Sequence, residues 1–315
     1  MSEDRHTDFY EKRKKGKFRL VEPPDTSFPV ADTHCHFEMF EDPAWNFVRC
    51  AVHNVKFIAC VLDSTDDGVE GMQKVEAAYA DYLGSEALLE QEVSKLAECS
   101  NASDPKKDLP PTPRLRYIVG THPHHAKKWD DAQEKNLREM LKNPKVSCVG
   151  EIGLDYHYDF SPKKDQIDVF KQQLKIANEV GLPVSLHLRE AHDDALKIFE
   201  EVGFCKHGTL LHCFNLGPED LKPWVEAGCY IAIGGPVTFK KFDWLREAVK
   251  LIPQDKLLTE TDAPFMTPEP MRGMTCWPDH VIFVADMLCK TLGEESNREE
   301  FYARMYQNAL DLLDR

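Results

Sequence analysis

Six residues of the sequence have the types and the positions of ligands to metal ions. His34 and His36 lie two residues apart, so on a strand both imidazoles would point to the same face. A histidine pair alone is a weak signal, but the other four residues each end a short apolar run: Glu151, His187, His212 and Asp262. Such side chains inside apolar strands are costly unless they are paired or bind metal. The pattern predicts a metal centre, with a hydrogen-bonded polar layer as the alternative.

The number of candidate ligands favours two divalent ions over one. Four imidazoles and two carboxylates exceed the four positions of a tetrahedral zinc ion, and a catalytic ion must also leave room for water. With a carboxylate such as Glu151 between them, two ions ~3.5 to 4 Å apart would activate a water molecule and stabilise a leaving oxygen. The donor set suits Zn²⁺ or Mn²⁺, and also Mg²⁺ when a substrate phosphate is present.

The elements that must position these residues are short β-rich runs that alternate with longer stretches of helical period. Each candidate ligand lies at the end of a run, which is where functional groups gather in a closed α/β barrel. We therefore predict a (β/α)8 TIM barrel. Its eight strands are expected at 29–34, 55–62, 115–120, 146–152, 183–188, 208–214, 229–233 and 256–261.

Between the runs, the sequence predicts helices at 165–180 and 191–201, each closed by a glycine. The interval after the second run is longer, and we predict a polar helix at 69–98 followed by a surface insertion at 103–113, which is rich in proline. Helices at 278–292 and 297–313 would cover the last face. We expect a charged, flexible leader over 1–27 and a single barrel domain over 28–315.

Composition narrows the functional class. The 315 residues are 42% hydrophobic and 30% charged, which is typical of a soluble globular protein, and no apolar run approaches the ~18 residues of a membrane span. The leader is too charged for a secretion signal, and the ten cysteines are scattered without a Cys-x-x-Cys pair, so reduced thiols in the cytoplasm are expected. A net charge of −15 argues against a broad surface for nucleic acid, so a polyanionic substrate must be held locally.

The motifs around these residues are specific enough to identify a family resemblance. From about Val30 to its end, the chain resembles the TatD family of metal-dependent deoxyribonucleases, within the amidohydrolase-like barrels. Six motifs in order carry the resemblance: DTHCH at 32–36, GTHPH at 120–124, GEIGLD at 150–155, HLREA at 187–191, HCF at 212–214 and ETDAP at 260–264.

The resemblance implies a role for each residue of the site. Two ligand sets would share Glu151 as a bridge: His34, His36, Glu151 and Asp262 for one ion, and Glu151, His187 and His212 for the other. Asp262 would also take the proton of the attacking water, and His122 would lie near the scissile phosphate. Arg189 and Arg272 are candidates for binding phosphate oxygens, because a guanidinium offers a planar fork of donors.

Two points of the resemblance stay open. His124 is a candidate for substrate binding, yet a histidine in this turn can also cap the following helix or face solvent. After the eighth strand, family members often carry an Arg-Asn-Glu-Pro stretch where this chain has Thr275 to Pro278. Trp277 there is either a stacking surface for a base or a core residue.

Three functions follow from these observations. The first is hydrolysis of DNA at single strands or strand ends, because a narrow barrel mouth admits a terminus better than a duplex. The second uses the same metal centre on a small-molecule amide, lactone or ester, which the fold alone does not exclude. The third is a metal-binding scaffold without turnover. No obligate protein partner is evident in the sequence.

Overall fold

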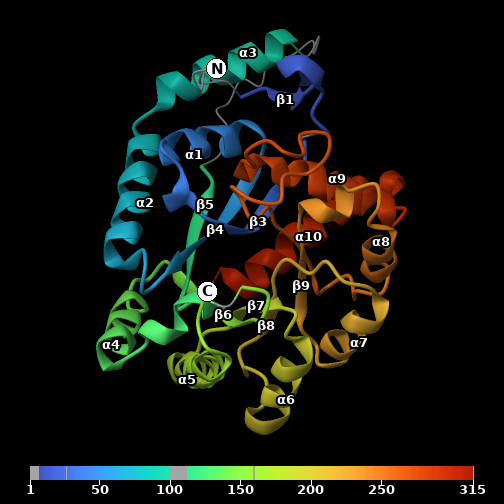
Figure 1. Cartoon of the computed structure of the whole chain (residues 1–315). Coiled ribbons are helices and arrows are strands. Elements are labelled where there is room, and N and C mark those ends of the chain that lie inside the picture. Colours follow the sequence, from blue (N-terminus) through green and yellow to red (C-terminus); the bar gives the residue numbers. More distant parts are fainter. Residues whose placement is uncertain (1–6, 26, 100–111, 159, 315) are drawn as a thin grey trace.

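The structure is a computed structural model that describes residues 7–25, 27–99, 112–158 and 160–314. Within these residues, eight parallel strands from β3 to β10 form one sheet in chain order, with helices around its outside (Figure 1). The predicted (β/α)8 barrel is confirmed. Its strands are β3 (Val30–Cys35), β4 (Val55–Asp63), β5 (Arg114–Gly120), β6 (Val146–Asp155), β7 (Val184–Arg189), β8 (Thr209–Leu211), β9 (Tyr230–Ile233) and β10 (Leu257–Thr259).

The first and last strands of the barrel are joined mainly by side chains. The hydroxyl of Thr33 donates to the carbonyl of Thr259 over 3.0 Å, and the hydroxyl of Thr259 donates to the carbonyl of Ala31 over 2.7 Å. At the end of this seam, the amide of Asp262 donates to the carbonyl of His34 over 2.9 Å. Two of the predicted ligands are thus held next to each other by the closure of the barrel.

The helices begin and end close to the predicted positions. α5 stops at Gly181, whose φ of 77° favours glycine at a helix C-terminus, and α6 stops at Gly203. None of the helices in the described ranges is long and apolar enough to cross a membrane. The helices after β3 to β10 are α1 (Pro43–Val52), α2 (Gly68–Leu83), α3 (Glu86–Cys99), α4 (Asp131–Met140), α5 (Lys163–Val180), α6 (His192–Val202), α7 (Pro218–Glu226), α8 (Asp243–Val249), α9 (Val281–Thr291) and α10 (Arg298–Leu313).

The long helix predicted at 69–98 is wrong in one respect, because the structure has two helices there. α2 ends at Gly84, and the hydroxyl of Ser85 donates back to the carbonyl of Tyr82 over 2.6 Å, which starts a new direction for α3. A serine that bonds its own backbone competes with helix continuation. Most of the predicted insertion at 103–113 lies outside the described residues.

The C-terminal helix covers one end of the barrel. Leu312 and Leu313 of α10 pack into the cluster formed by inward side chains of the strands, including Phe57 and Ile118. Asn308 donates to the carbonyl of Leu257, at the start of β10, over 2.9 Å. α10 therefore closes the N-terminal ends of the strands and leaves their C-terminal ends open.

Part of the leader that we expected to be flexible forms a hairpin. β1 (Phe9–Lys12) pairs with β2 (Phe18–Val21) in an antiparallel sheet beside α3 (Figure 1), and Phe9 is buried. The alternation of buried and exposed side chains in β1 anchors this segment, while residues 1–6 and 26 lie outside the described part. The expectation of flexibility is therefore corrected for the hairpin.

Phe9 covers a buried group of charged side chains, which we call the Arg49 cluster: Arg49, His53, Asp279 and His280. Arg49 binds both carboxylate oxygens of Asp279, at 3.1 and 2.9 Å, and His53 Nδ1 lies 2.8 Å from the same carboxylate. The Arg49 guanidinium also lies 5.5 Å from the centre of the Phe9 ring and 5.3 Å from that of Trp277. Trp277 stacks on Phe40 within the core, which agrees with the second of its two predicted roles.

Candidate metal centre

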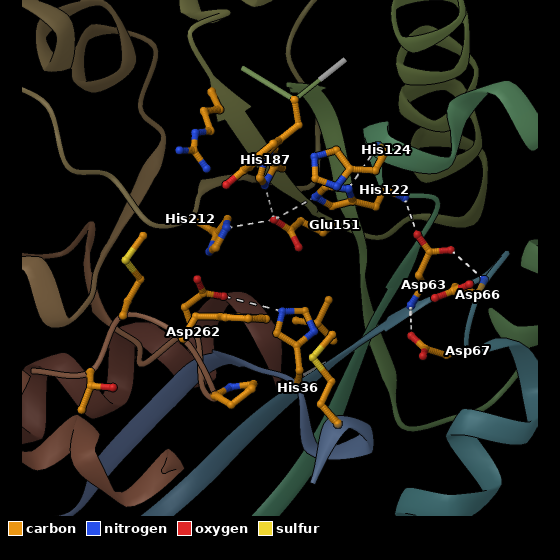
Figure 2. A pocket seen from close by; sticks show the side chains of 18 of the residues that line it. His36, Asp63, Asp66, Asp67, His122, His124, Glu151, His187, His212 and Asp262 are labelled. Atoms are coloured by element: carbon orange, nitrogen blue, oxygen red, sulfur yellow. Dashed lines mark hydrogen bonds and ion pairs between the residues drawn. The ribbon is translucent and has the colours of Figure 1, made fainter. Parts of the chain in front are cut away.

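The predicted ligands meet at the open end of the barrel. Figure 2 shows five of them around one pocket, and the sixth, His34, is fully buried and contacts Glu151. His34 and Glu151 lie within β3 and β6, and His187 lies within β7. The other three follow strands: His36 after β3, His212 after β8 and Asp262 after β10.

An irregularity in β6 brings Glu151 into this position. The pairing of β6 with β7 shifts register between Val149 and Ile152, as in a β-bulge, which redirects a side chain. Gly153 follows with a φ of 141°, and a Cβ there would collide with the carbonyl oxygen of His187. The glycine of the motif thus lets β6 approach β7 closely beside the site.

The two carboxylate oxygens of Glu151 face different histidines. Oε1 lies 2.6 Å from His187 Nδ1 and 2.9 Å from His212 Nε2, and it lies 3.8 Å from His122 Nε2. Oε2 lies 3.5 Å from His34 Nε2. Glu151 therefore stands between two groups of imidazoles, as the central carboxylate in Figure 2 shows.

Asp262 stands on the other side of His34. Its Oδ1 lies 3.8 Å from His34 Nε2 and 3.6 Å from His36 Nε2. The backbone of Asp262 has a φ of 61°, which is uncommon for a residue other than glycine and costs free energy. The hydrogen bond across the seam to His34 holds it there. Asp262 thus keeps an unfavourable backbone conformation in the position where its side chain lines the pocket.

Three further carboxylates hold the imidazoles from behind. Glu38 Oε1 lies 3.4 Å from His36 Nδ1, and Glu260 Oε2 lies 3.4 Å from His212 Nδ1. Each contact leaves the Nε2 of that ring facing the centre. A carboxylate behind a metal-binding histidine fixes its tautomer and strengthens it as a ligand. Asp155 does the same for His187, with its Oδ2 at 3.0 Å from Nε2.

The sequence prediction gave no role to these carboxylates. Asp155 and Glu260 lie inside the GEIGLD and ETDAP motifs, and both are buried. The signal that could have identified Glu260 is its position, two residues before Asp262 at the end of an apolar run. Glu38 follows His36 by two residues, in a 3-10 helix (Phe37–Met39), and it offered no pattern by which to recognise it.

The charges of the centre depend on one another. Burial opposes ionisation of Glu151, but the surrounding imidazoles, led by His212 and His187, hold the pKa of its carboxyl well below the usual range. Burial likewise disfavours the charged form of His212, yet Glu151 and Glu260 raise its pKa well above the usual value. Burial and the nearby His212 lower the pKa of His34.

These residues fit divalent cations. Among the described residues, neither ring nitrogen of fully buried His34 has a hydrogen-bond partner, and such a polar atom is costly to bury unless something binds it. Nitrogen and oxygen ligand atoms come within 4.8 Å of one another in three groups: His34, His36 and Asp262; His34, Glu151 and His212; and His122, His124 and His187. His187 is thus grouped with His122 and His124, although it also contacts Glu151.

The predicted substrate residues surround the centre. His122, His124, Arg189 and Arg272 all line a pocket of about 820 Å³, which is within the usual size range of ligand-binding pockets. The Arg189 guanidinium lies 4.7 Å from the ring centre of Tyr158, and that of Arg272 lies 4.0 Å from the ring centre of Phe239. Both arginines are exposed.

One wall of the pocket is acidic, which the sequence prediction did not anticipate. Asp63, Asp66 and Asp67 lie together there, apart from the histidines of the centre (Figure 2). Burial and the charge of Glu38 raise the pKa of Asp67 to about 6. Asp63 is paired with His125, 3.0 Å away. This wall would repel phosphate groups, so it restricts where a polyanion can lie.

Comparison with known proteins places the chain among metal-dependent hydrolases. The family model described as "TatD related DNase" matches residues 31–314. An uncharacterized metal-dependent hydrolase, YabD of Bacillus subtilis, is 39% identical over 62% of this chain and 76% of its own length. The 3'-5' ssDNA/RNA exonuclease TatD of Pantoea vagans is 32% identical over 80% of this chain and 91% of its own length.

Solved structures agree with the fold. YJJV, a TatD homologue from Escherichia coli, superposes with a TM-score of 0.71 at 25% identity, covering 91% of this chain and 98% of that one. A β-aspartyl dipeptidase from Fervidobacterium islandicum superposes with a TM-score of 0.54 at 12% identity, covering 91% of this chain and 75% of that one. The second likeness shows the barrel fold alone.

Proposed function

Because this chain belongs to the family of TatD-related DNases, we propose that it is a metal-dependent exonuclease acting on the end of a single nucleic-acid strand. The observation that carries the proposal is a buried carboxylate, Glu151, with imidazoles at both of its oxygens, at the base of a pocket lined by two arginines. The family resemblance seen in the six motifs is confirmed by the match over 31–314.

We propose two ions that share Glu151. His34, His36 and Asp262 would hold one with Glu151 Oε2, and His187 and His212 would hold the other with Oε1. The separate partners of the two oxygens support this division. Divalent ions held here would make a water molecule more acidic and offset the negative charge that accumulates on the phosphate. Imidazole and carboxylate ligands together suit Zn²⁺ or Mn²⁺, with Mg²⁺ as the third candidate.

Asp262 is the proposed proton acceptor. Burial opposes its ionisation, but the contact with His36 and the charge of His212 lower the pKa of its carboxyl below the usual value. It is therefore ionised at neutral pH and faces the pocket. In this position it would take the proton of the attacking water while His36 and His34 keep its carboxylate in place.

The remaining groups would hold the substrate. The backbone amide of His124 donates a hydrogen bond to His122 Nδ1 over 3.1 Å. This leaves His122 Nε2 as the ring nitrogen available to a ligand in the pocket. With His124, Arg189 and Arg272, it offers donors to phosphate oxygens. The relatives called TatD are named as exonucleases of single-stranded DNA and RNA. We propose that this chain also acts on single-stranded DNA, and on RNA as well. The acidic wall and the net charge of −15 argue against a long duplex contact.

The experiment uses oligonucleotides labelled at either end. Single-stranded DNA, RNA and blunt duplex are each incubated with the purified protein and Mn²⁺, Zn²⁺ or Mg²⁺, with excess chelator as control. We expect stepwise shortening from the 3' end of single strands, which chelator abolishes and one of the metals restores. Loss of turnover in Glu151→Gln at unchanged folding would exclude a contaminating nuclease. Cleavage that persists in chelator would contradict the proposal.

A panel of small esters, lactones and amides tests the second predicted function under the same conditions. The distant likeness to a dipeptidase gives it no support beyond the fold. Turnover on that panel without any on oligonucleotides would replace the nuclease proposal. We further propose a single domain over 28–315, and the cytoplasm as its compartment, where the buried thiols would stay reduced.

A further inference from the structure

Two aromatic rings beside the pocket are exposed and have no role in the centre. Tyr158 and Phe160 follow β6, and their side chains are 41% and 54% exposed. The two rings are stacked, with an angle of 6° between their planes and 5.5 Å between their centres. Exposed apolar surface of this kind costs free energy in water and often marks a binding site.

Hydrogen bonds hold the described residues next to these rings. Asp155 Oδ1 accepts the amides of His157 and Tyr158, each over 2.9 Å. The hydroxyl of Ser161 donates to the carbonyl of His124 over 2.7 Å, and Gln166 donates to the carbonyl of Ser161 over 2.8 Å. Tyr158 and Ser161, the residue after Phe160, are thus each bonded to the barrel, and both rings pack against His124.

The same carboxylate links the rings to the metal centre. Asp155 Oδ2 lies 2.9 Å from His124 Nε2 and 3.0 Å from His187 Nε2. The His124 ring in turn meets Tyr158 and Phe160 edge-on, at 5.6 and 4.8 Å between ring centres. A ligand lying on the two rings would therefore be next to His124, proposed to bind its phosphate, and close to His187, proposed to hold an ion.

Charge around the pocket favours this side for a nucleotide. Arg189 lies over the Tyr158 ring, where its positive charge is available to a phosphate attached to a stacked base. The acidic wall carries Asp63, Asp66 and Asp67; Asp63 is paired with His125 and Asp66 lies 3.7 Å from Lys128, so three carboxyl groups face two cations and the remaining negative charge repels a phosphate backbone. A strand can approach the centre over the aromatic rings with less repulsion than over the acidic wall.

We propose that Tyr158 and Phe160 form a stacking platform for an unpaired base next to the scissile phosphate. The inference rests on the proposed nuclease function and adds a requirement for a base. Every nucleobase has a π face, so the platform accepts DNA and RNA without sequence preference. A base held in a duplex cannot lie on it, which gives the pocket its preference for single strands.

The test combines protein and substrate changes. The substrates are a single-stranded oligonucleotide and the same oligonucleotide with abasic residues at its last two 3' positions. The proteins are wild type, Phe160→Ala and Tyr158→Phe, with Trp244→Ala as the matched control, because Trp244 is also an exposed ring (46%) but packs against Phe242, whereas Phe160 packs against His124. Turnover and binding are both measured, the latter by anisotropy, and thermal unfolding and metal content verify each variant.

We expect the wild type to lose about 10-fold in kcat/KM on the abasic oligonucleotide, and Phe160→Ala to lose a similar factor on the normal one. On the abasic oligonucleotide, Phe160→Ala and wild type should be equal, because the contact is already absent. Tyr158→Phe should keep wild-type values, since it retains the ring. Trp244→Ala should match wild type on both substrates.

The outcomes separate the platform from the nuclease function. Turnover that is equally fast on normal and abasic strands overturns the platform and leaves the nuclease intact. An equal loss for Phe160→Ala on both substrates also overturns it, since the effect is then not on a base. Base-dependent binding without turnover supports the platform and contradicts the nuclease, and absence of both binding and turnover contradicts the two together.

Discussion

Two buried groups of histidines and carboxylates differ in how their charge is balanced. In the Arg49 cluster, Asp279 has an arginine on both oxygens and a histidine at 2.8 Å, so its charge is met within the protein. At the candidate metal centre, the carboxylates of Glu151, Asp262, Glu260 and Glu38 surround the imidazoles, and within the described residues no arginine or lysine forms an ion pair with these carboxylates.

The difference separates a structural cluster from a site. A buried carboxylate that has its own cation needs nothing further, and removing that cation is destabilising. A buried set of carboxylates and imidazoles without one can be balanced only by protonation or by a bound cation. The kinds of residue are the same in both places, and the presence of Arg49 in one of them distinguishes their roles.

The largest effect is expected at Asp262. Asp262→Asn keeps an oxygen that can still contact a cation but removes the basicity needed to accept a proton. We expect turnover of a single-stranded oligonucleotide to fall ~10²- to 10⁴-fold with at least one ion retained. Turnover and metal content are measured on the same sample. Wild-type turnover with both ions bound would show that another group accepts the proton.

The next effect tests the Arg49 cluster. Arg49→Met leaves Asp279 buried without its cation, and we expect the free energy of unfolding to fall by ~3 to 5 kcal/mol. Chemical denaturation measures it, and metal content should not change. The double variant Arg49→Met, Asp279→Leu should recover much of the loss, because it removes the stranded charge as well. A single variant as stable as wild type would contradict the internal balance of this cluster.

Removal of metal should distinguish the two groups directly. At a free metal concentration of ~100 times Kd, binding stabilises the folded protein by ~2.7 kcal/mol. Chelator should remove this amount from wild type and from Arg49→Met alike, as two additive changes. If thermal unfolding is the same with and without chelator, the carboxylates of the centre are balanced without an ion.

The smallest effect that we expect is on the free energy of unfolding at acidic pH. Burial lowers the pKa of His280 to about 3, although the nearby Asp279 opposes the shift. Because the folded pKa is depressed, the neutral form stabilises the protein fully above pH ~6.5, and this stability is lost as pH falls towards 3.

A His280→Gln variant cannot bind this proton. In excess chelator, its unfolding free energy should therefore depend less steeply on pH between 6.5 and 3 than that of wild type, by up to ~1.4 kcal/mol per pH unit. Denaturation at several pH values measures both slopes. Parallel slopes would show that His280 is charged, or equally titratable, in the folded protein.

The sequence predicted the barrel, and it pointed to six candidate ligands that the structure brings together, because both leave local patterns. Buried parallel strands appear as short apolar runs, and His212 or Asp262 stands out at the end of one. The roles of Glu38 and the platform rings were missed because no motif or periodic pattern in the sequence marks these residues. Tyr158 and Phe160 lie in a loop without periodicity, and only the bonds of Asp155 show that they are held in place.

The leader was misjudged for a related reason. Its lysines and arginines suggested a solvated segment, while a single ring, Phe9, decides where the chain lies. Only two residues of β1 are buried, Phe9 and Glu11, and so short an alternation does not stand out in a sequence segment that is otherwise highly charged. Likewise, one hydroxyl at Ser85 ends a helix whose polar pattern continues across it. The composition of a segment therefore does not reveal single residues, such as Phe9 or Ser85, that contribute most to its conformation.

The seam of the barrel has a consequence for biosynthesis. His34 and His36 leave the ribosome early, but Asp262 joins them only when β10 has paired alongside β3, and α10 must follow to cover the other end. A nascent or truncated chain that lacks these last elements has the histidines without their shared carboxylate. Loading of the proposed ion between them would therefore be a late event, and in a cell it would mark chains whose synthesis is complete.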